Sequence, residues 1–211
     1  MKKLAIIVAV MVVLSPAIQA QKGGGGMGGM QLGIKLGPNF STWTGEDAEP
    51  GSDASKKMLI APHFGVFMTI PLTSMLLLQP ELLYSMQGVR YKYDDGYKET
   101  YRTNHLNIPI ALRIQTPGGF YAIIGPQVGF SLGGKYKWEY EGEEDEEDLE
   151  DLKSVAFSGV IGFGYQMPNG FGVYARYAHT FSAPFDFEDE DIKLHNSLMM
   201  LSFFYMFKLN K

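Results

Sequence analysis

The chain has 211 residues, contains no cysteine and carries a formal net charge of −5. This length allows one domain with a sizeable core, and the lack of cysteine excludes a fold held by disulfides. Because no basic stripe is available to neutralise phosphates, we do not expect a nucleic-acid partner. The 25 glycines and the 13% of aromatic residues are together typical of strand-rich proteins.

The N-terminus has the layout of a secretory signal peptide. A basic start, Met1-Lys2-Lys3, precedes an apolar run over 4–14, and a small residue, Ala20, ends the region. We therefore expect residues 1–20 to direct Sec export and to be cleaved. The apolar run is too short for a membrane-spanning helix. The glycine-rich segment 21–30 is expected to be a flexible linker.

From Gln31 onward the hydrophobic pattern has a period of two, which predicts strands rather than helices. In each predicted strand one alternating set of residues is apolar, and the other set is mostly small or polar. The eight predicted strands cover residues 31–40, 60–70, 76–87, 106–115, 122–131, 157–166, 171–178 and 198–207.

Strands of roughly ten residues can cross a bilayer when tilted, and an even number allows a closed barrel. A soluble barrel would expose only the four ionisable residues that lie on these strands, too few for a water-facing surface. The sequence therefore predicts an all-β fold over 31–211, an eight-stranded antiparallel up-and-down transmembrane β-barrel in the outer membrane. Both termini are expected in the periplasm.

The connections between the strands alternate between short and long. Three are predicted tight turns and carry no charge, at 71–74, 116–119 and 167–170. Four are predicted long polar loops, at 41–58, 88–100, 133–153 and 181–195. Transmembrane barrels have short periplasmic turns and longer extracellular loops. Of the 23 acidic residues, only Glu81 lies away from the long connections.

Four segments resemble the outer-membrane β-barrel domain of the porin family, also described as PorT-like. The resemblance covers roughly residues 31–207 and implies a barrel in a Gram-negative cell envelope. It implies no biochemical activity, but it allows a role as an accessory to secretion. The segments are QLGIKLGPNFS, LLLQPELLYSMQG, HLNIPIAL and FYAIIGPQVGFSLGG.

The segment LLLQPELLYSMQG places a carboxylate, Glu81, on the side that faces the barrel interior. A buried carboxylate needs cationic partners, and Lys35, Arg113 and Arg176 have the same parity on other strands. We predict an internal ion cluster in which Glu81 contacts Arg113 on the neighbouring strand or Lys35 across the lumen. The cluster is interpreted as a plug, or alternatively as a gate in a narrow pore. Pro80 requires a bulge or a local break in the ladder.

The segment 140–153 contains nine carboxylates in fourteen residues. Such a run repels itself, so we expect a solvated, mobile loop. The alternative is a site for divalent cations or for a basic partner, although the spacing does not match a calcium loop. A second acidic run covers 186–191. The candidate residues of the first run are Glu143, Glu144, Asp145, Glu146, Glu147 and Asp148.

The sequence gives little support for catalysis. His195 and Ser197 are two residues apart and could form a base and nucleophile pair, but no acidic residue follows Asp191 to orient the imidazole. The remaining histidines show no metal-ligand spacing. We expect no catalytic residues, no metal site and no cofactor.

Aromatic residues at the strand ends are predicted to form the two girdles at the membrane interfaces. One girdle would contain Tyr84, Tyr91, Tyr93, Tyr97 and Tyr101, and the other would contain Phe120, Tyr121 and Phe171.

These features together predict a monomeric, non-enzymatic barrel with a structural or surface-interaction role and acidic extracellular loops. Its expected partners are outer-membrane lipid or lipopolysaccharide and other envelope proteins. The alternatives are a narrow, porin-like channel and a barrel subunit of an envelope secretion complex.

Overall fold

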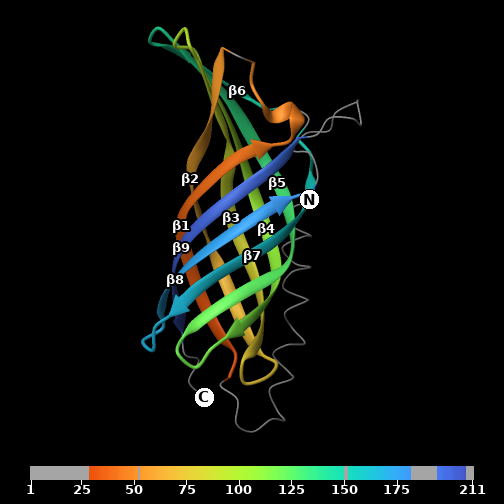
Figure 1. Ribbon diagram of the computed structural model, residues 1–211, viewed down its shortest axis with the longest axis vertical. Coiled ribbons are helices and arrows are strands. Elements are labelled where there is room, and N and C mark those ends of the chain that lie inside the picture. The colour runs from red at the N-terminus through yellow and green to blue at the C-terminus, as the bar shows by residue number, and fades with distance from the viewer. Residues whose placement is uncertain (1–28, 52, 150–151, 182–193, 208–211) are drawn as a thin grey trace.

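The computed structural model describes residues 29–51, 53–149, 152–181 and 194–207 (Figure 1). The predicted signal peptide, most of the glycine-rich linker and the second acidic run lie outside these residues. Within the described ranges, no helix has the length and apolar character needed to cross a membrane.

Eight strands form a closed antiparallel ring in the order β1-β2-β3-β4-β5-β7-β8-β9, and pairing of β9 with β1 completes it. The predicted eight-stranded up-and-down barrel is therefore confirmed. A ninth strand, β6, lies outside the ring and pairs with the far end of β5. The elements are β1 (Gln31–Thr44), η2 (Glu46–Ala48), β2 (Ala54–Pro71), β3 (Leu76–Tyr93), β4 (Lys98–Gln115), β5 (Phe120–Tyr140), β6 (Glu143–Asp148), β7 (Val155–Gln166), β8 (Phe171–Thr180) and β9 (His195–Phe207).

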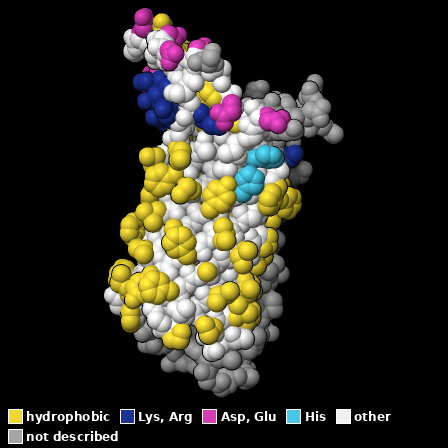
Figure 2. All heavy atoms as spheres, in the orientation of Figure 1, with side chains coloured by type: hydrophobic (Ala, Val, Ile, Leu, Met, Phe, Trp, Pro, Cys, Tyr) yellow, Lys and Arg dark blue, Asp and Glu magenta, His cyan; other side chains and the backbone are white. Residues whose placement is uncertain are grey.

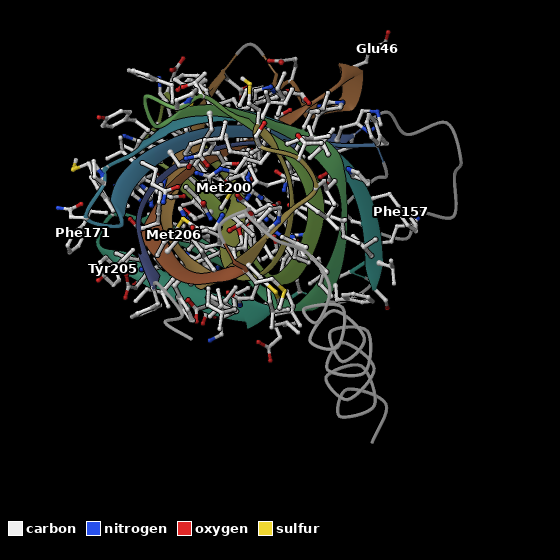
Figure 3. The ribbon with its side chains drawn as sticks, turned by 90° about the horizontal axis from the view of Figure 1, so that it is seen from below. Glu46, Phe157, Phe171, Met200, Tyr205 and Met206 are labelled. Carbon is white, nitrogen blue, oxygen red and sulfur yellow. The ribbon has the colours of Figure 1, made fainter. Side chains whose placement is uncertain are left out.

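The two alternating sets of residues in each strand face opposite sides of the ring, one set toward the lumen and the other outward. Along β9, Met200 and Met206 point into the barrel, whereas Tyr205 and, on β8, Phe171 lie outside it (Figure 3). Outward apolar side chains form a belt, which Figure 2 shows across one face of the barrel. Members of the belt include Leu32, Ile34, Leu36, Ile60, Phe64, Val66, Ile110, Ile114, Ile124, Phe157, Ile161, Phe163, Met199, Leu201 and Phe203.

The three predicted tight turns lie together at one end of the barrel. Leu72 N–H donates to the Leu76 carbonyl at 2.8 Å in the β2–β3 turn. Gly119 (φ 89°) and Gly170 (φ 95°) close the β4–β5 and β7–β8 turns in the left-handed region that favours glycine. At this same end β1 begins and β9 finishes, with Leu32 paired to Phe207.

At the opposite end, the prediction of long loops over 88–100 and 133–153 is wrong. Strands β3 and β4 continue to a short turn at 94–97, where Tyr93 N–H donates to the Tyr97 carbonyl at 2.9 Å. β5 has 21 residues and turns back into β6. These strands therefore exceed the predicted ten residues and extend beyond the apolar belt.

The predicted mobile loop at 140–153 is also largely replaced by structure, because residues 143–148 form β6. Lysines on β5 lie opposite these carboxylates and offset their mutual repulsion. Lys137 Nζ lies 2.6 Å from Glu144 Oε2, and Lys135 forms an ion pair with Glu146.

Pro80 lies at a local break in the ladder rather than at a bulge. It pairs with Ile110 on β4. Toward β2, the pairs on either side of it are Phe67 with Glu81 and Ile70 with Leu78, and both have the same register. The missing proline N–H is thus accommodated without a shift of the strand.

Candidate functional site

The interior of the barrel contains an ion cluster around Glu81. Lys35 Nζ lies 2.8 Å from Glu81 Oε2, and Arg176 forms a second ion pair with the same oxygen. Gln79 donates to the other carboxylate oxygen at 2.7 Å. The side chains of Lys35, Glu81 and Arg176 are at most 2% exposed. Strands β1, β3 and β8 therefore bring three charged groups together across the lumen.

Arg113 does not contact Glu81 directly, although the two residues lie on neighbouring strands. It donates to Gln79 Oε1 at 3.1 Å and to Gln166 Oε1 at 2.6 Å. Gln79 therefore connects Arg113 to the carboxylate. The four residues together carry three cations and one anion, so other groups must stabilise the excess positive charge.

Aromatic rings in the lumen provide part of that stabilisation. Lys35 Nζ lies 5.1 Å and 4.9 Å from the ring centroids of Phe67 and Tyr174. The Arg113 guanidinium lies 3.6 Å from the centroid of Tyr121. Cation–π contacts of this kind strengthen when they are desolvated. Together with Phe204, these rings fill the end of the lumen beside the tight turns.

Sequence reasoning did not single out the interior rings. A signal was nevertheless present, because each of three rings faces a glycine on the neighbouring strand. The cross-strand pairs are Gly33 with Phe67, Gly164 with Tyr121, and Gly172 with Phe204. In each pair, a methyl group at the glycine would overlap the ring. An eight-stranded barrel has just enough interior width for its side chains, so a large ring requires a small neighbour.

A second feature is the projecting sheet, which we define as the part of β2–β6 that extends beyond the apolar belt (Figure 1). It comprises residues 54–58, 88–93, 98–104, 133–140 and 143–148. The strand register shows which residues share a face of this sheet. Val89 on β3 pairs with Tyr101 on β4, and Tyr101 pairs with Tyr136 on β5, so these three residues lie on one face. Val89 is fully buried against Trp43 in the mouth of the barrel, so this face is the inner one.

The inner face of the projecting sheet is aromatic. Neighbouring ring centroids are 5.0 Å apart for Tyr101 and Tyr136, 5.5 Å for Tyr93 and Tyr97, and 6.3 Å for Tyr97 and Trp138. These distances are typical of interacting aromatic pairs. The rings on this face and at its tip are Tyr91, Tyr93, Tyr97, Tyr101, Tyr136, Trp138 and Tyr140.

Glu99 holds these rings in place. It accepts hydrogen bonds from Tyr136 at 2.8 Å and from Tyr93 at 3.1 Å, and Tyr97 donates to the Tyr136 hydroxyl at 3.1 Å. Burial raises the pKa of Tyr101 to about 12. Burial, with the hydrogen bonds to Tyr97 and Glu99, also raises the pKa of Tyr136. The phenols of Tyr101 and Tyr136 therefore stay neutral at physiological pH.

The six acidic residues of β6 divide between the two faces. Glu144 and Glu146 lie on the outer face with their lysine partners. The register puts Glu143, Asp145 and Glu147 on the inner face beside the aromatic rings, and in the described chain these three carboxylates form no ion pair. An open hollow of about 680 Å³ is lined by Tyr101, Tyr136, Glu147, Asp148 and Leu149. Within the described residues, no group of three or more histidines and acids could hold a metal ion.

The predicted aromatic girdles are only partly correct. Tyr84 faces outward and stacks on Phe64, with 5.0 Å between centroids. At the other rim, Phe120 and Phe171 are exposed. Tyr121, however, is buried in the lumen. The four tyrosines Tyr91, Tyr93, Tyr97 and Tyr101 belong to the inner face of the projecting sheet, because β3 and β4 continue as strands beyond the membrane interface.

The imidazole within hydrogen-bond distance of Ser197 is that of His179. Its Nδ1 lies 3.3 Å from Ser197 Oγ, and the Tyr177 hydroxyl is also 3.3 Å from that oxygen. Among the residues that the structure covers, neither His179 nor His195 has a carboxylate hydrogen-bonded to its imidazole. His63 is buried elsewhere and lies 2.8 Å from Ser202 Oγ. The described geometry thus lacks the group that would orient a catalytic base.

Comparisons with known proteins agree with the fold. Residues 19–186 match the sequence family described as "Outer membrane protein beta-barrel domain". No curated protein matches. Among solved structures, Neisserial surface protein A is similar with 9% identity and a TM-score of 0.51, covering 85% of this chain and 99% of that one.

Two further structures have lower TM-scores. Ail, the attachment invasion locus protein of Yersinia pestis, has 10% identity and a TM-score of 0.47, covering 85% of this chain and 99% of its own. OprG of Pseudomonas aeruginosa has 15% identity and a TM-score of 0.39, covering 86% of this chain and 98% of its own.

Proposed function

Since the chain belongs to the outer membrane protein beta-barrel domain family, we propose that it is a closed, non-enzymatic barrel that binds an extracellular partner through its projecting sheet. The tight turns and the chain ends would then lie on the periplasmic side, as is usual for such barrels. The partner would bind on the inner face of the sheet and carry positive charge.

The observation that carries this proposal is the combination of aromatic rings and unpaired carboxylates on that face. Glu143, Asp145 and Glu147 are exposed beside Tyr136 and Trp138, and an open hollow lies at their base. Aromatic residues supply large contact areas at low conformational cost and dominate binding hot spots. Carboxylates beside ring faces suit lysine and arginine side chains, which form ion pairs and cation–π contacts together.

The packed lumen supports a closed barrel rather than a pore. The ion cluster around Glu81 and the rings of Phe67, Tyr121 and Tyr174 are buried in the interior. Opening the lumen would separate these buried partners, and a buried charge that loses its partner is strongly destabilising, so we interpret the cluster as a plug that also fixes strand register. On this interpretation, Lys35, Arg113 and Arg176 are structural residues.

Co-purification from intact envelopes tests the proposal with two charge-matched variants. Glu143→Gln/Asp145→Asn/Glu147→Gln removes three carboxylates from the inner face, and Glu139→Gln/Glu144→Gln/Glu146→Gln removes three from the outer face. The proposal predicts that partner proteins crosslink to the wild type and to the outer-face variant, and are lost with the inner-face variant. Loss with both variants, or with neither, would contradict it.

Two alternatives are distinguished by independent measurements. A narrow channel requires conductance in planar bilayers, whereas the proposed plug predicts a silent membrane. A barrel subunit of a secretion complex, which the PorT-like resemblance allows, would crosslink to envelope proteins through its belt or its periplasmic turns rather than through Trp138.

A further inference from the structure

The outer face of the projecting sheet is basic directly above the apolar belt. Figure 2 shows a dark blue patch between the yellow belt and the magenta tip. The register places the outward cations of β2, β3, β4 and β5 side by side on this face. We call this group the basic band, and it consists of Lys57, Arg90, Lys92, Lys98, Arg102, Lys135 and Lys137.

Three pairs of like charges face each other directly across this band. Lys57 pairs with Arg90, Lys92 with Lys98, and Arg102 with Lys135 in neighbouring strands. Like charges directly opposite one another destabilise a sheet. An anion bound against this face would reduce the repulsion between these cations.

The chain neutralises only one end of the band. Lys98, Lys135 and Lys137 form ion pairs with Glu139, Glu146 and Glu144. In the described part of the chain, no carboxylate lies within ion-pair distance of the four remaining cations, although Arg90 Nε donates to Thr100 Oγ1 at 3.1 Å. The four are Lys57, Arg90, Lys92 and Arg102.

The distance of these cations from the apolar belt indicates which anion they meet. On β2, Lys57 lies three residues before Ile60, a member of the belt, which corresponds to about 10 Å along a strand and less along the tilted barrel axis. The register irregularity between Met58 and His63 allows both residues to face outward. On β4, Arg102 lies four residues beyond Leu106 in the same outward series. Long basic side chains reach back toward a membrane interface, so these groups lie at the level of the lipid headgroups.

We propose that Lys57, Arg90, Lys92 and Arg102 bind the phosphate groups of the glycolipid in the outer leaflet. Guanidinium and ammonium groups are the usual ligands of phosphate, and a row of them on an outward face suits a planar layer of phosphates. This inference rests on the outer-membrane location and on the proposed orientation, with the projecting sheet outside the cell. It does not rest on the partner proposed for the inner face, because the two faces of the sheet are opposite.

Lipid retention in nanodiscs tests the inference. The protein is reconstituted in phosphatidylcholine with either lipid A or lipid A lacking its phosphates, and the glycolipid retained after dilution is counted by native mass spectrometry. Wild type should retain the phosphorylated form selectively. Lys57→Gln/Arg102→Gln should weaken retention by about fivefold for each removed cation, the typical contribution of one Lys or Arg at an anionic membrane surface.

The matched control is Lys56→Gln/Lys153→Gln, which removes the same charge from other positions. Lys56 pairs with Glu49 at 2.5 Å, and Lys153 lines a small polar chamber inside the barrel. This control should retain lipid A like wild type, and inorganic phosphate should not displace the lipid. Equal retention of both glycolipids by wild type, or unchanged retention by Lys57→Gln/Arg102→Gln, would overturn the inference.

A second measurement uses only the wild type, so it tests the inference even if Lys57→Gln/Arg102→Gln does not fold. Retention of lipid A by wild type should fall as salt rises from low to high ionic strength, because exposed charges are screened. Salt-independent retention would also overturn the inference.

Discussion

Glu81 is the residue on which the interior of the barrel depends. Its carboxylate lies among three buried cations, and two of them contact the same oxygen. Its place in an otherwise apolar segment is explained by the alternation of faces, since its neighbours Pro80 and Leu82 point outward while Glu81 points inward. Charge, hydrogen bonding and ring contacts then combine in one closed cluster.

Replacement of this carboxylate should reduce stability without opening a pore. Glu81→Gln leaves Lys35 and Arg176 without their anion, and breaking a buried pair typically costs about 3–5 kcal/mol. We expect a loss of this size in the free energy of unfolding, measured in urea on protein folded into lipid vesicles. Removing one cation as well, in Glu81→Gln/Lys35→Met, should restore part of the loss. An increase in conductance with unchanged stability would instead identify a gate.

The glycine opposite each interior ring provides a test of the packing. Gly33→Ala would place a methyl group into the Phe67 ring, and overpacking of this kind costs about 1–3 kcal/mol. The same substitution in a Phe67→Leu background should cost much less. Gly118→Ala is the control, because a methyl group there meets only Thr116 at 4.0 Å. Equal losses at Gly33 in both backgrounds would show that the ring does not determine the requirement for glycine.

At the scale of the element, the hairpin of β5 and β6 is the least expected part of the structure. Its six acidic residues in a row show no alternation of apolar and polar types, so the usual strand signal is absent. The partner strand supplies the missing information, since Lys135 and Lys137 lie opposite Asp148 and Glu146 in register. A single segment read alone cannot reveal that pairing.

Ion pairs within β5 and between β5 and β6 give the hairpin a defined dependence on pH. Hydrogen bonding to Lys137 lowers the pKa of Glu139, and hydrogen bonding to Lys135 lowers the pKa of Glu146. Because both pKa values are lower in the folded state, the stabilisation is present above the ordinary carboxylate pKa, about 4.3, and is lost as the pH falls through the lowered values.

Hydrogen exchange should therefore show amide protection in residues 135–148 that is high at neutral pH and decreases in acid. The reference is amide exchange in strand pairs inside the belt, such as β1 with β9. All rates are first corrected for the intrinsic pH dependence of amide exchange. Protection that rises on acidification would mean that repulsion among the carboxylates outweighs their pairing with lysine.

At the scale of the whole molecule, the ring of strands and its two faces could be predicted from the sequence, because alternation survives in every strand inside the belt. The full length of β3, β4 and β5 is not among the predictions, because charged residues such as Arg90 and Lys92 indicate a polar loop once a strand is long enough to cross a bilayer. Their alternation with Tyr91 and Tyr93 is nevertheless a strand signal. Register shifts between Met58 and His63, and between Asn104 and His105, also change the pattern beyond the belt.

The partners of Glu81 illustrate a second limit of sequence reasoning. Arg113 is on the adjacent strand, yet Lys35 and Arg176, from β1 and β8, contact the carboxylate. Which side chains meet across a lumen depends on strand tilt and stagger, and these properties belong to the closed barrel rather than to any pair of segments.

Our main proposal is that the inner face of the projecting sheet is the binding surface of an otherwise closed barrel. Site-specific photocrosslinking in intact cells tests it most directly, with the reactive group placed in turn at positions 138 and 137. These neighbours lie on opposite faces of the same strand. We expect protein adducts from position 138 and none from 137. Adducts from 137 alone, or from neither position, would contradict it.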